Sequence, residues 1–108
     1  MFKLKADPTF QAKVAFPVFG GASVDVQLTF KHRTKAELAK WLEEGRQTTE
    51  GSVRRTDEQT FFEMVVGWEI DEPFNKENVA ILLDHHIGVA LATYQTYIDE
   101  LTRHREKN

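Results

Sequence analysis

The first third of the chain holds two stretches in which apolar and polar residues alternate, separated by a pair of adjacent glycines. One stretch covers about residues 10–18 and the other about residues 22–32. Alternation with a period of two is typical of strands that bury one face and leave the other in water. The pattern therefore predicts an N-terminal antiparallel β-hairpin, with its turn at Gly20 and Gly21.

The register of this hairpin follows from the residues that each turn length would place opposite one another. A two-residue turn would set Phe16 against Asp25, whereas a three-residue loop over residues 19–21 sets Phe16 against Val24. We expect the longer loop, because it pairs apolar residues along the whole hairpin. Pro17 has no N–H to donate to a sheet, so the first strand is expected to lie at an edge there.

Beyond the hairpin, the apolar positions recur at the spacing of helices. Four helices are predicted, over about residues 35–44, 57–66, 76–84 and 87–103. Thr34 and Glu37 have the spacing of a capping box at the start of the first helix, and Asn75 is the expected cap of the third. Gly45 is expected to end the first helix and Gly67 the second.

The last helix carries one apolar stripe, whose members follow one another in steps close to the helical period. These residues are Ile87, Leu91, Tyr94, Ile98 and Leu101. Gly88, next to His85 and His86, is expected to mark a bend between the third and fourth helices. The polar residues 46–55 are expected to form a loop between the first and second helices.

The order of these elements, two strands and then about four helices, predicts a fold of the α+β class. We expect residues 1–108 to form one domain in which the helices pack on one face of the N-terminal hairpin. Two strands alone are only marginally stable, so helices or a partner must cover their apolar face.

Composition narrows the classes of protein to which the chain can belong. Its 108 residues include no cysteine, which excludes disulfides, thiolate metal sites and a cysteine nucleophile. No apolar run has the length of a membrane helix, and the first residues lack the apolar stretch of a signal peptide. The chain is therefore expected to be soluble and intracellular.

The charges are unevenly distributed along the chain. With 14 Lys and Arg against 17 Asp and Glu the formal net charge is −3, yet residues 1–56 carry +4 and residues 57–77 carry −6. Such a chain either presents an electrostatic face or intermixes both signs on a solvated surface after folding. In both cases an acidic chain is poorly suited to being held on nucleic acid by its overall charge.

No combination of residues in the sequence indicates catalysis, a metal site or a cofactor. On a helix, the adjacent His85 and His86 would point about 100° apart, unlike the pairs four residues apart that share one ion. The two serines, Ser23 and Ser52, lie outside the Gly-x-Ser-x-Gly motif of hydrolases. We therefore predict a protein that is not an enzyme and holds no cofactor.

A small regulator that binds nucleic acid is the alternative from a different class of function. Its phosphate contacts would come from five basic residues: Lys31, Arg33, Lys35, Arg54 and Arg55. These cations are too few for a convincing footprint on nucleic acid, so the sequence disfavours this alternative.

The aromatic residues point instead to a protein partner. Eight Phe, two Trp and two Tyr are a heavy load for a chain of this length, so some apolar surface is expected to remain exposed. The candidates for partner binding are Trp68, Phe74, Tyr94 and Tyr97, because Trp and Tyr are common anchors at interfaces. The alternative, that all four pack inside the fold, stays open at this point.

Several short segments carry a resemblance to a known family through their order and spacing. They are residues 8–10, the Gly-Gly hairpin, residues 29–34 leading into 37–38, residues 66–68, residues 74–78 before 82–83, and the closing Tyr94, Tyr97, Ile98 and Leu101. Together they resemble the tail assembly chaperones of long-tailed bacteriophages and prophages, over about residues 7–108. One departure is the sequence from His85 to Gly88, where the family has a Tyr-Pro-like break.

The resemblance implies a non-catalytic role in tail assembly. Proteins of this family bind the long, helical, aggregation-prone tape measure protein, keep it soluble while the tail is built, and are absent from the finished particle. The implied partners are the tape measure protein and, for recruitment, the tail tube protein, with no membrane and with action in the bacterial cytoplasm. We expect the aromatic face around Trp68 to meet tape measure helices, with electrostatic selection by residues 57–77. Whether the chain forms a homo-oligomer stays open.

Overall fold

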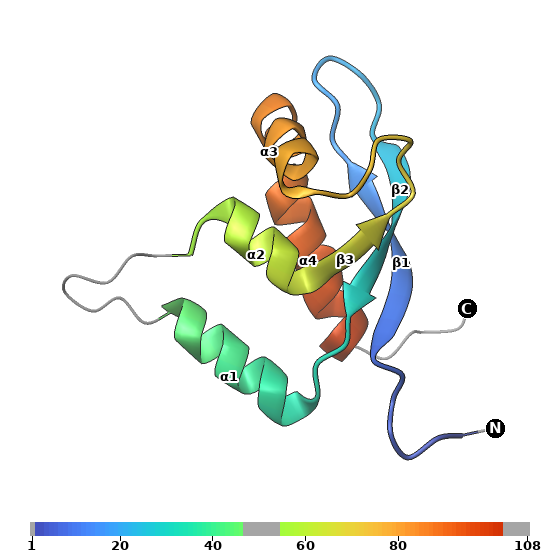
Figure 1. The fold of residues 1–108 in the computed structure, drawn as a ribbon, viewed down its shortest axis with the longest axis vertical. Coiled ribbons are helices and arrows are strands. Elements are labelled where there is room, and N and C mark those ends of the chain that lie inside the picture. The colour runs from blue at the N-terminus through green and yellow to red at the C-terminus, as the bar shows by residue number, and fades with distance from the viewer. Residues whose placement is uncertain (1, 47–54, 103–108) are drawn as a thin grey trace.

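The computed structural model describes residues 2–46 and 55–102, so most of the loop predicted over residues 46–55 lies outside the described ranges. In chain order the elements are β1 (Thr9–Phe16), β2 (Val24–Lys31), α1 (Lys35–Arg46), α2 (Asp57–Met64), β3 (Val65–Trp68), α3 (Lys76–His85) and α4 (Val89–Thr102). The strands form one antiparallel sheet in the order β1-β2-β3 (Figure 1). The predicted α+β class, with an N-terminal hairpin followed by four helices, is confirmed.

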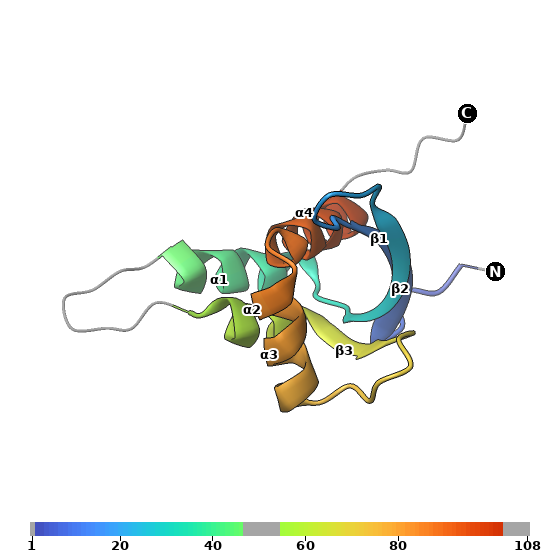
Figure 2. The ribbon, with the colours of Figure 1, turned by 90° about the horizontal axis from the view of Figure 1, so that it is seen from above.

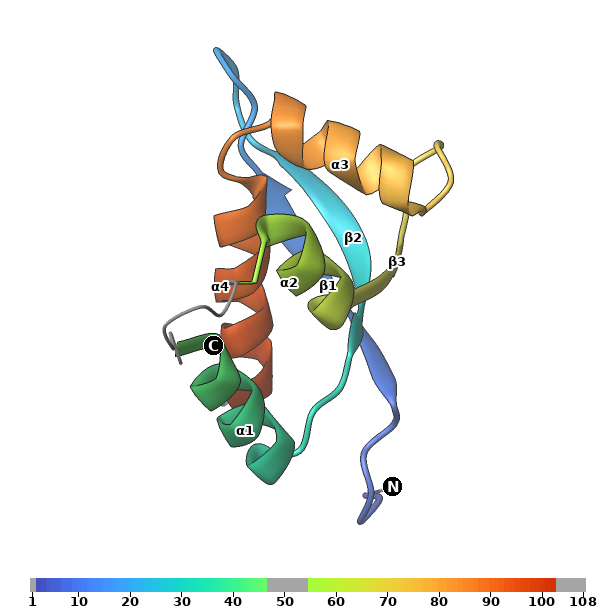
Figure 3. The ribbon, with the colours of Figure 1, turned by 60° about the vertical axis from the view of Figure 1, so that its left-hand side comes forward.

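The helices cover one face of the sheet. Helices α2, α3 and α4 lie on one side of the curved sheet, and α1 lies farther from it (Figure 2). Helix α4 packs along β1, while α2 lies between α4 and β3 (Figure 3). The largest completely buried side chains come from both layers: Tyr97, Phe30, Phe61, Leu28 and Met64. Most of the apolar face of the hairpin is thus removed from water, as its marginal stability requires, while Val24 near the loop stays exposed.

The hairpin adopts the predicted register, but its loop is longer than predicted. Phe16 lies opposite Val24, and the same register continues along both strands. Because pairing stops there, the loop covers residues 17–23 in place of the predicted 19–21, and both predicted strands extended too far into it. Pro17 follows β1 directly, and β1 is an edge strand of the sheet. A residue without an N–H accounts for the early end of the ladder.

The predicted helix over residues 57–66 is wrong at its C-terminal end. Helix α2 begins with a capping box, in which Gln59 N donates to Thr56 Oγ1 at 3.1 Å, and it ends at Met64. Val65–Trp68 is instead strand β3, which pairs with β2. β-Branched side chains favour extended backbone, and the free edge of β2 offers hydrogen-bonding groups to a third strand.

Neither glycine that was predicted to end a helix does so. Gly67 lies inside β3, opposite Thr29. Gly45 lies inside α1, which continues to Arg46. A Cβ added at Gly45 would lie 3.0 Å from Nη1 of Arg55, so the missing side chain makes room for a neighbouring segment. At Gly45, therefore, a contact between distant segments accounts for the glycine, and not a helix end.

Helix α1 is attached to the rest of the fold along a narrow stripe. Its predicted capping box is present, because Glu37 N donates to Thr34 Oγ1 at 3.1 Å and Thr34 N donates to the Glu37 carboxylate at 2.8 Å. Among the described side chains of α1, Leu38 and Trp41 are buried and Leu42 is half-buried. The position of this helix therefore depends on a few contacts.

A tight bend joins α3 to α4, as predicted from His85, His86 and Gly88. Asn75 caps the start of α3, where its side chain accepts a hydrogen bond from the backbone three residues on at 2.8 Å. His86 is the C-cap of α3, and Gly88 has a φ of +101°, in the region that favours glycine. A Cβ added at Gly88 would lie 3.1 Å from Cγ of Pro17 in the hairpin loop. The bend thus packs closely against the hairpin.

The face of α4 that packs on the sheet is not the apolar stripe seen in the sequence. Val89, Thr93 and Tyr97 lie one turn apart and are completely buried. The stripe that begins at Ile87 and ends at Leu101 faces elsewhere, and Ile87 itself lies before the helix, which starts two residues later than predicted. Helix α4 is therefore apolar on more than one side.

Tyr97 occupies the centre of the core. Its ring stacks against Phe30 and Phe10, with ring centroids 5.4 Å and 6.2 Å away. Its hydroxyl donates to the carbonyl of Lys31 at 2.7 Å and accepts a hydrogen bond from Arg33 at 2.8 Å. The one polar atom of this side chain is thereby satisfied, as a buried hydroxyl must be.

Replacing Gly88 with alanine is expected to destabilise the fold by more than the same change at Gly20. Both glycines have positive φ, +101° and +75°, so alanine is strained at either position by about 1–2 kcal/mol. At Gly88 the new Cβ would also meet Pro17 at 3.1 Å, whereas at Gly20 no described atom lies within 4 Å. Urea denaturation measures both free energies of unfolding. Equal losses of unfolding free energy in the two variants would show that the contact between Pro17 and the bend adds no steric cost.

Replacing Tyr97 with phenylalanine is expected to flatten the loss of stability at alkaline pH. Burial raises the pKa of Tyr97 above its ordinary value of 10.0, although the hydrogen bond from Arg33 opposes this shift. Folding therefore favours the neutral phenol, whose contribution is complete below pH 10 and is lost as the pH rises through the folded-state pKa. The free energy of unfolding, measured against pH, should fall less steeply above pH 10 in Tyr97→Phe than in the wild type. An unchanged slope in Tyr97→Phe would contradict the expectation.

Candidate functional site

The four aromatic residues predicted to bind a partner lie in three different places. Tyr97 is completely buried, so it is a core residue and cannot present its ring to a partner in this fold. Trp68 and Phe74 pack against each other, with ring centroids 5.2 Å apart. Tyr94 lines a groove beside α4 to which neither Trp68 nor Phe74 contributes. The structure thus does not bring the four together as one face.

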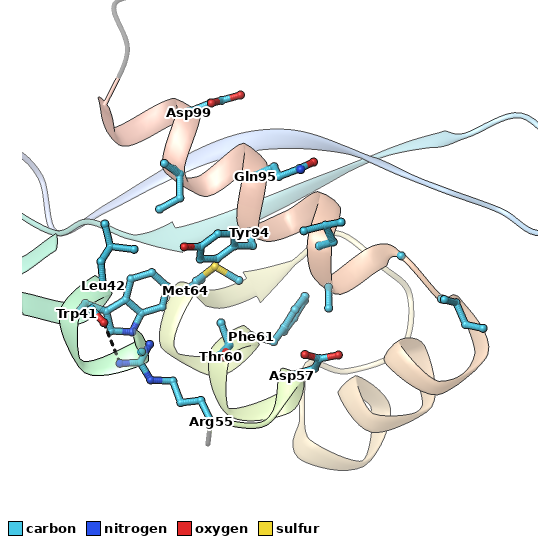
Figure 4. A pocket seen from close by; sticks show the side chains of 16 residues that line it. Trp41, Leu42, Arg55, Asp57, Thr60, Phe61, Met64, Tyr94, Gln95 and Asp99 are labelled. Carbon is cyan, nitrogen blue, oxygen red and sulfur yellow. Dashed lines mark hydrogen bonds between the residues drawn. The ribbon is translucent and has the colours of Figure 1, made fainter. Parts of the chain in front are cut away.

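The groove that contains Tyr94 is open to solvent and lies between α1, α2 and α4 (Figure 4). Its volume is about 1210 Å³. Trp41 and Leu42 of α1 line it, as do Phe61 and Met64 of α2. Three segments far apart in the sequence therefore contribute large apolar side chains to a single concave surface, which is the usual character of a binding site.

The α4 side of this groove is formed by the apolar stripe that stood out in the sequence. Ile87, Leu91, Tyr94 and Ile98 all line it. Ile87 and Leu91 are 90% and 60% exposed, while Tyr94 and Ile98 are half-buried. Contiguous exposed apolar surface is uncommon on soluble domains and marks sites where partners bind.

Trp41 is held at the groove by three charged side chains. Its Nε1 donates to the carboxylate of Glu63 at 2.7 Å. The guanidinium carbons of Arg33 and Arg55 lie 4.6 Å and 5.0 Å from the centroid of the indole, and Arg55 also donates to the Trp41 carbonyl at 2.9 Å. The ring of Tyr94 on α4 stands 6.1 Å from the indole. These contacts hold α1 in place beside α4 and so shape the groove.

Two carboxylates stand at the borders of the groove. Asp57 begins α2 and Asp99 lies near the end of α4, and they flank the groove on opposite sides (Figure 4). Arg55, the one cation among the described lining residues, is paired with Glu44 at 3.7 Å and with Glu63 at 3.3 Å. The described part of the groove therefore has an apolar centre and negative borders.

Trp68 and Phe74 belong to a second aromatic cluster, which is completed by Phe62 of α2. The ring centroids of Phe62 and Phe74 are 5.3 Å apart. The indole N–H of Trp68 donates to the carbonyl of Glu72 at 2.8 Å, which ties down the loop between β3 and α3. All three rings are half-buried, so the cluster supports the loop and also leaves part of each ring open to a partner.

The basic residues of the nucleic-acid alternative do not form a free cationic surface. Arg33 and Arg55 are hydrogen-bonded within the fold and lie against an indole ring. Lys31 and Lys35 are exposed, and Arg54 lies outside the described residues. Two of the five cations that this alternative needs are therefore engaged in contacts within the fold.

Residues 2–46 and 55–102 contain neither a metal-binding cluster nor a membrane-spanning helix. Within these ranges no group of three or more His, Asp or Glu side chains could hold a metal ion. Within the same ranges no helix combines the length and the apolar character that crossing a membrane demands. The adjacent His85 and His86 lie at the bend between α3 and α4.

Sequence reasoning did not select Ile87, Leu91 or Trp41 as candidates for partner binding. A signal for the first two was present, because α4 carries this stripe in addition to the buried face that contains Val89 and Tyr97. When a helix is apolar on two sides and the core covers one of them, the other side is available to a partner. No comparable signal marked Trp41, whose place in the groove depends on α1 lying beside α4.

Comparison with known proteins tests the family resemblance. A family model described as phage tail assembly chaperone matches residues 1–108, which is the whole chain. No curated protein and no solved structure matched the chain. The chain belongs to the phage tail assembly chaperone family.

Proposed function

We propose that this chaperone binds the tape measure protein and keeps it soluble while the phage tail is assembled. The family supports a role with phage tail proteins, and the resemblance in sequence implies the tape measure protein among them. The groove between α1, α2 and α4 is the surface that we assign to this partner. The proposed role is non-catalytic, takes place in the cytoplasm of the bacterial host and ends before the virion is complete.

The observation that carries the proposal is the exposed apolar stripe on the α4 side of the groove. Ile87 and Leu91 are 90% and 60% exposed, although they stand beside buried apolar side chains. A helical, aggregation-prone partner has apolar stripes of its own, and packing the two stripes together removes both from water. Fully burying one Leu or Ile side chain contributes about 1.5–3 kcal/mol, most of which association itself offsets. One groove therefore holds a helix weakly, as a chaperone that must release its client requires.

The second aromatic cluster extends the surface that can meet tail proteins. Trp68 and Phe74 remain our candidates for partner contact, because their rings are half-buried and stand beside an acidic loop. The exposed carboxylates of Glu69, Asp71 and Glu72 in that loop repel other acidic surfaces. We assign recruitment of tail tube subunits to this cluster.

Changing both exposed residues of the stripe to glutamine is expected to abolish the chaperone effect. In Ile87→Gln/Leu91→Gln the groove loses two large apolar side chains, so affinity for the tape measure protein should fall about 100-fold. The control, Val66→Gln/Ile81→Gln, changes residues that are 46% and 50% exposed and lie outside the groove. Co-expression with the tape measure protein, followed by measurement of its soluble fraction, checks the expectation.

The outcomes of this experiment separate the site from the function. If wild-type chaperone does not raise the soluble fraction of the tape measure protein, the proposed function is wrong. If the groove variant and the control both act like the wild type, and circular dichroism shows both folded, the groove is not the site. Trp68→Ala/Phe74→Ala then tests the second cluster in the same assay.

A further inference from the structure

The stripe on the α4 side of the groove has the spacing of a coiled-coil seam. Within α4, the steps from Leu91 through Tyr94 to Ile98 are three and four residues, and Ile87 adds an exposed apolar side chain at the bend before the helix. This alternation of three and four is the a and d pattern by which one helix packs along another. The surface left open by the fold is therefore shaped for a helix and not for an extended strand.

The length of the groove sets the size of the helix that it would take. The lining residues within α4 run from Ala90 to Asp99. At 1.5 Å of rise per residue this distance is about 14 Å, or roughly two and a half helical turns. A helix of about 10 residues would thus lie along α4, with Trp41 and Leu42 of α1 meeting its other side.

The charges at the borders of the groove favour one class of helix. Neither Asp57 nor Asp99 has an ion-pair partner within residues 2–46 and 55–102. The positive charge of Arg55 is already taken up by Glu44 and Glu63. An occupant with acidic residues beside its seam would be repelled from both sides of the groove, whereas basic residues would be attracted.

We propose that the groove selects apolar helices whose seam is bordered by Lys or Arg. This inference rests on the proposed function, because it specifies the kind of tape measure segment that the groove would hold. The apolar seam supplies most of the affinity, and the pairing of basic side chains with Asp57 and Asp99 supplies the selection. The same rule disfavours occupants that carry acidic residues beside their apolar seam.

Two synthetic helices test this selection. Both are stapled so that they are helical in water and both carry the same leucine seam, but one has Lys and the other Glu beside the seam. The chain contains two tryptophans, so Trp68→Phe leaves Trp41 in the groove as the only fluorescent indole. Titration of each peptide into this full-length variant reports binding through the fluorescence of Trp41.

The Lys-bordered peptide is expected to bind at least about 10-fold more tightly at ~50 mM salt, with the difference shrinking at ~500 mM. Asp57→Asn/Asp99→Asn should bring the two affinities together while the leucine seam still binds. The control Asp71→Asn/Asp84→Asn removes the same charge from exposed carboxylates outside the groove and should keep the preference.

Equal binding of the two peptides, tighter binding of the Glu-bordered peptide, or binding of neither would overturn the inference. Each of these outcomes leaves the proposed function standing if the soluble fraction of the tape measure protein still depends on the groove. Conversely, selective binding of the Lys-bordered peptide with no effect on the tape measure protein would support the inference and contradict the proposed function.

Discussion

The placement of Arg33 between Tyr97 and Trp41 is the interaction on which most of this structure depends. The guanidinium donates to the Tyr97 hydroxyl at 2.8 Å and to the carbonyl of Glu63 at 2.6 Å, and it lies over the indole of Trp41. One side chain thus joins the segment after β2 to α4, α2 and α1. A half-buried cation is tolerated only where its donors are satisfied, so each of these elements must take its place around it.

The position of α1 follows from this arrangement and creates the groove. Few side chains of α1 are buried, and one of them, Trp41, has the guanidinium groups of Arg33 and Arg55 over its ring. These contacts place α1 beside α4 and not on the sheet, so one side of α4 remains uncovered. The resulting surface is apolar in its centre because α4 is apolar on two sides, one for the core and one for the groove.

The exposed apolar surface of the groove suits a small chaperone. A chain of 108 residues buries a smaller share of its surface than a large protein does, so some apolar side chains stay exposed in any fold. Here they are gathered on one concave surface with carboxylates at its borders, where a partner helix can cover them. The family assignment implies phage tail proteins as partners, and the groove is the surface on which we propose that one is held.

The strands of the hairpin, its register and the capped starts of the helices could be predicted because they depend on neighbours along the chain. Alternation set the pairing of Phe16 with Val24, and short-range hydrogen bonds set the caps at Thr34 and Asn75. The strand Val65–Trp68 could not, because it is only four residues long, follows α2 directly, and pairs with the distant edge of β2. Tyr94 and Tyr97 likewise look equivalent in the sequence. One lines a groove and the other fills the core because burial depends on which side of α4 meets the sheet, a choice made by packing between distant segments.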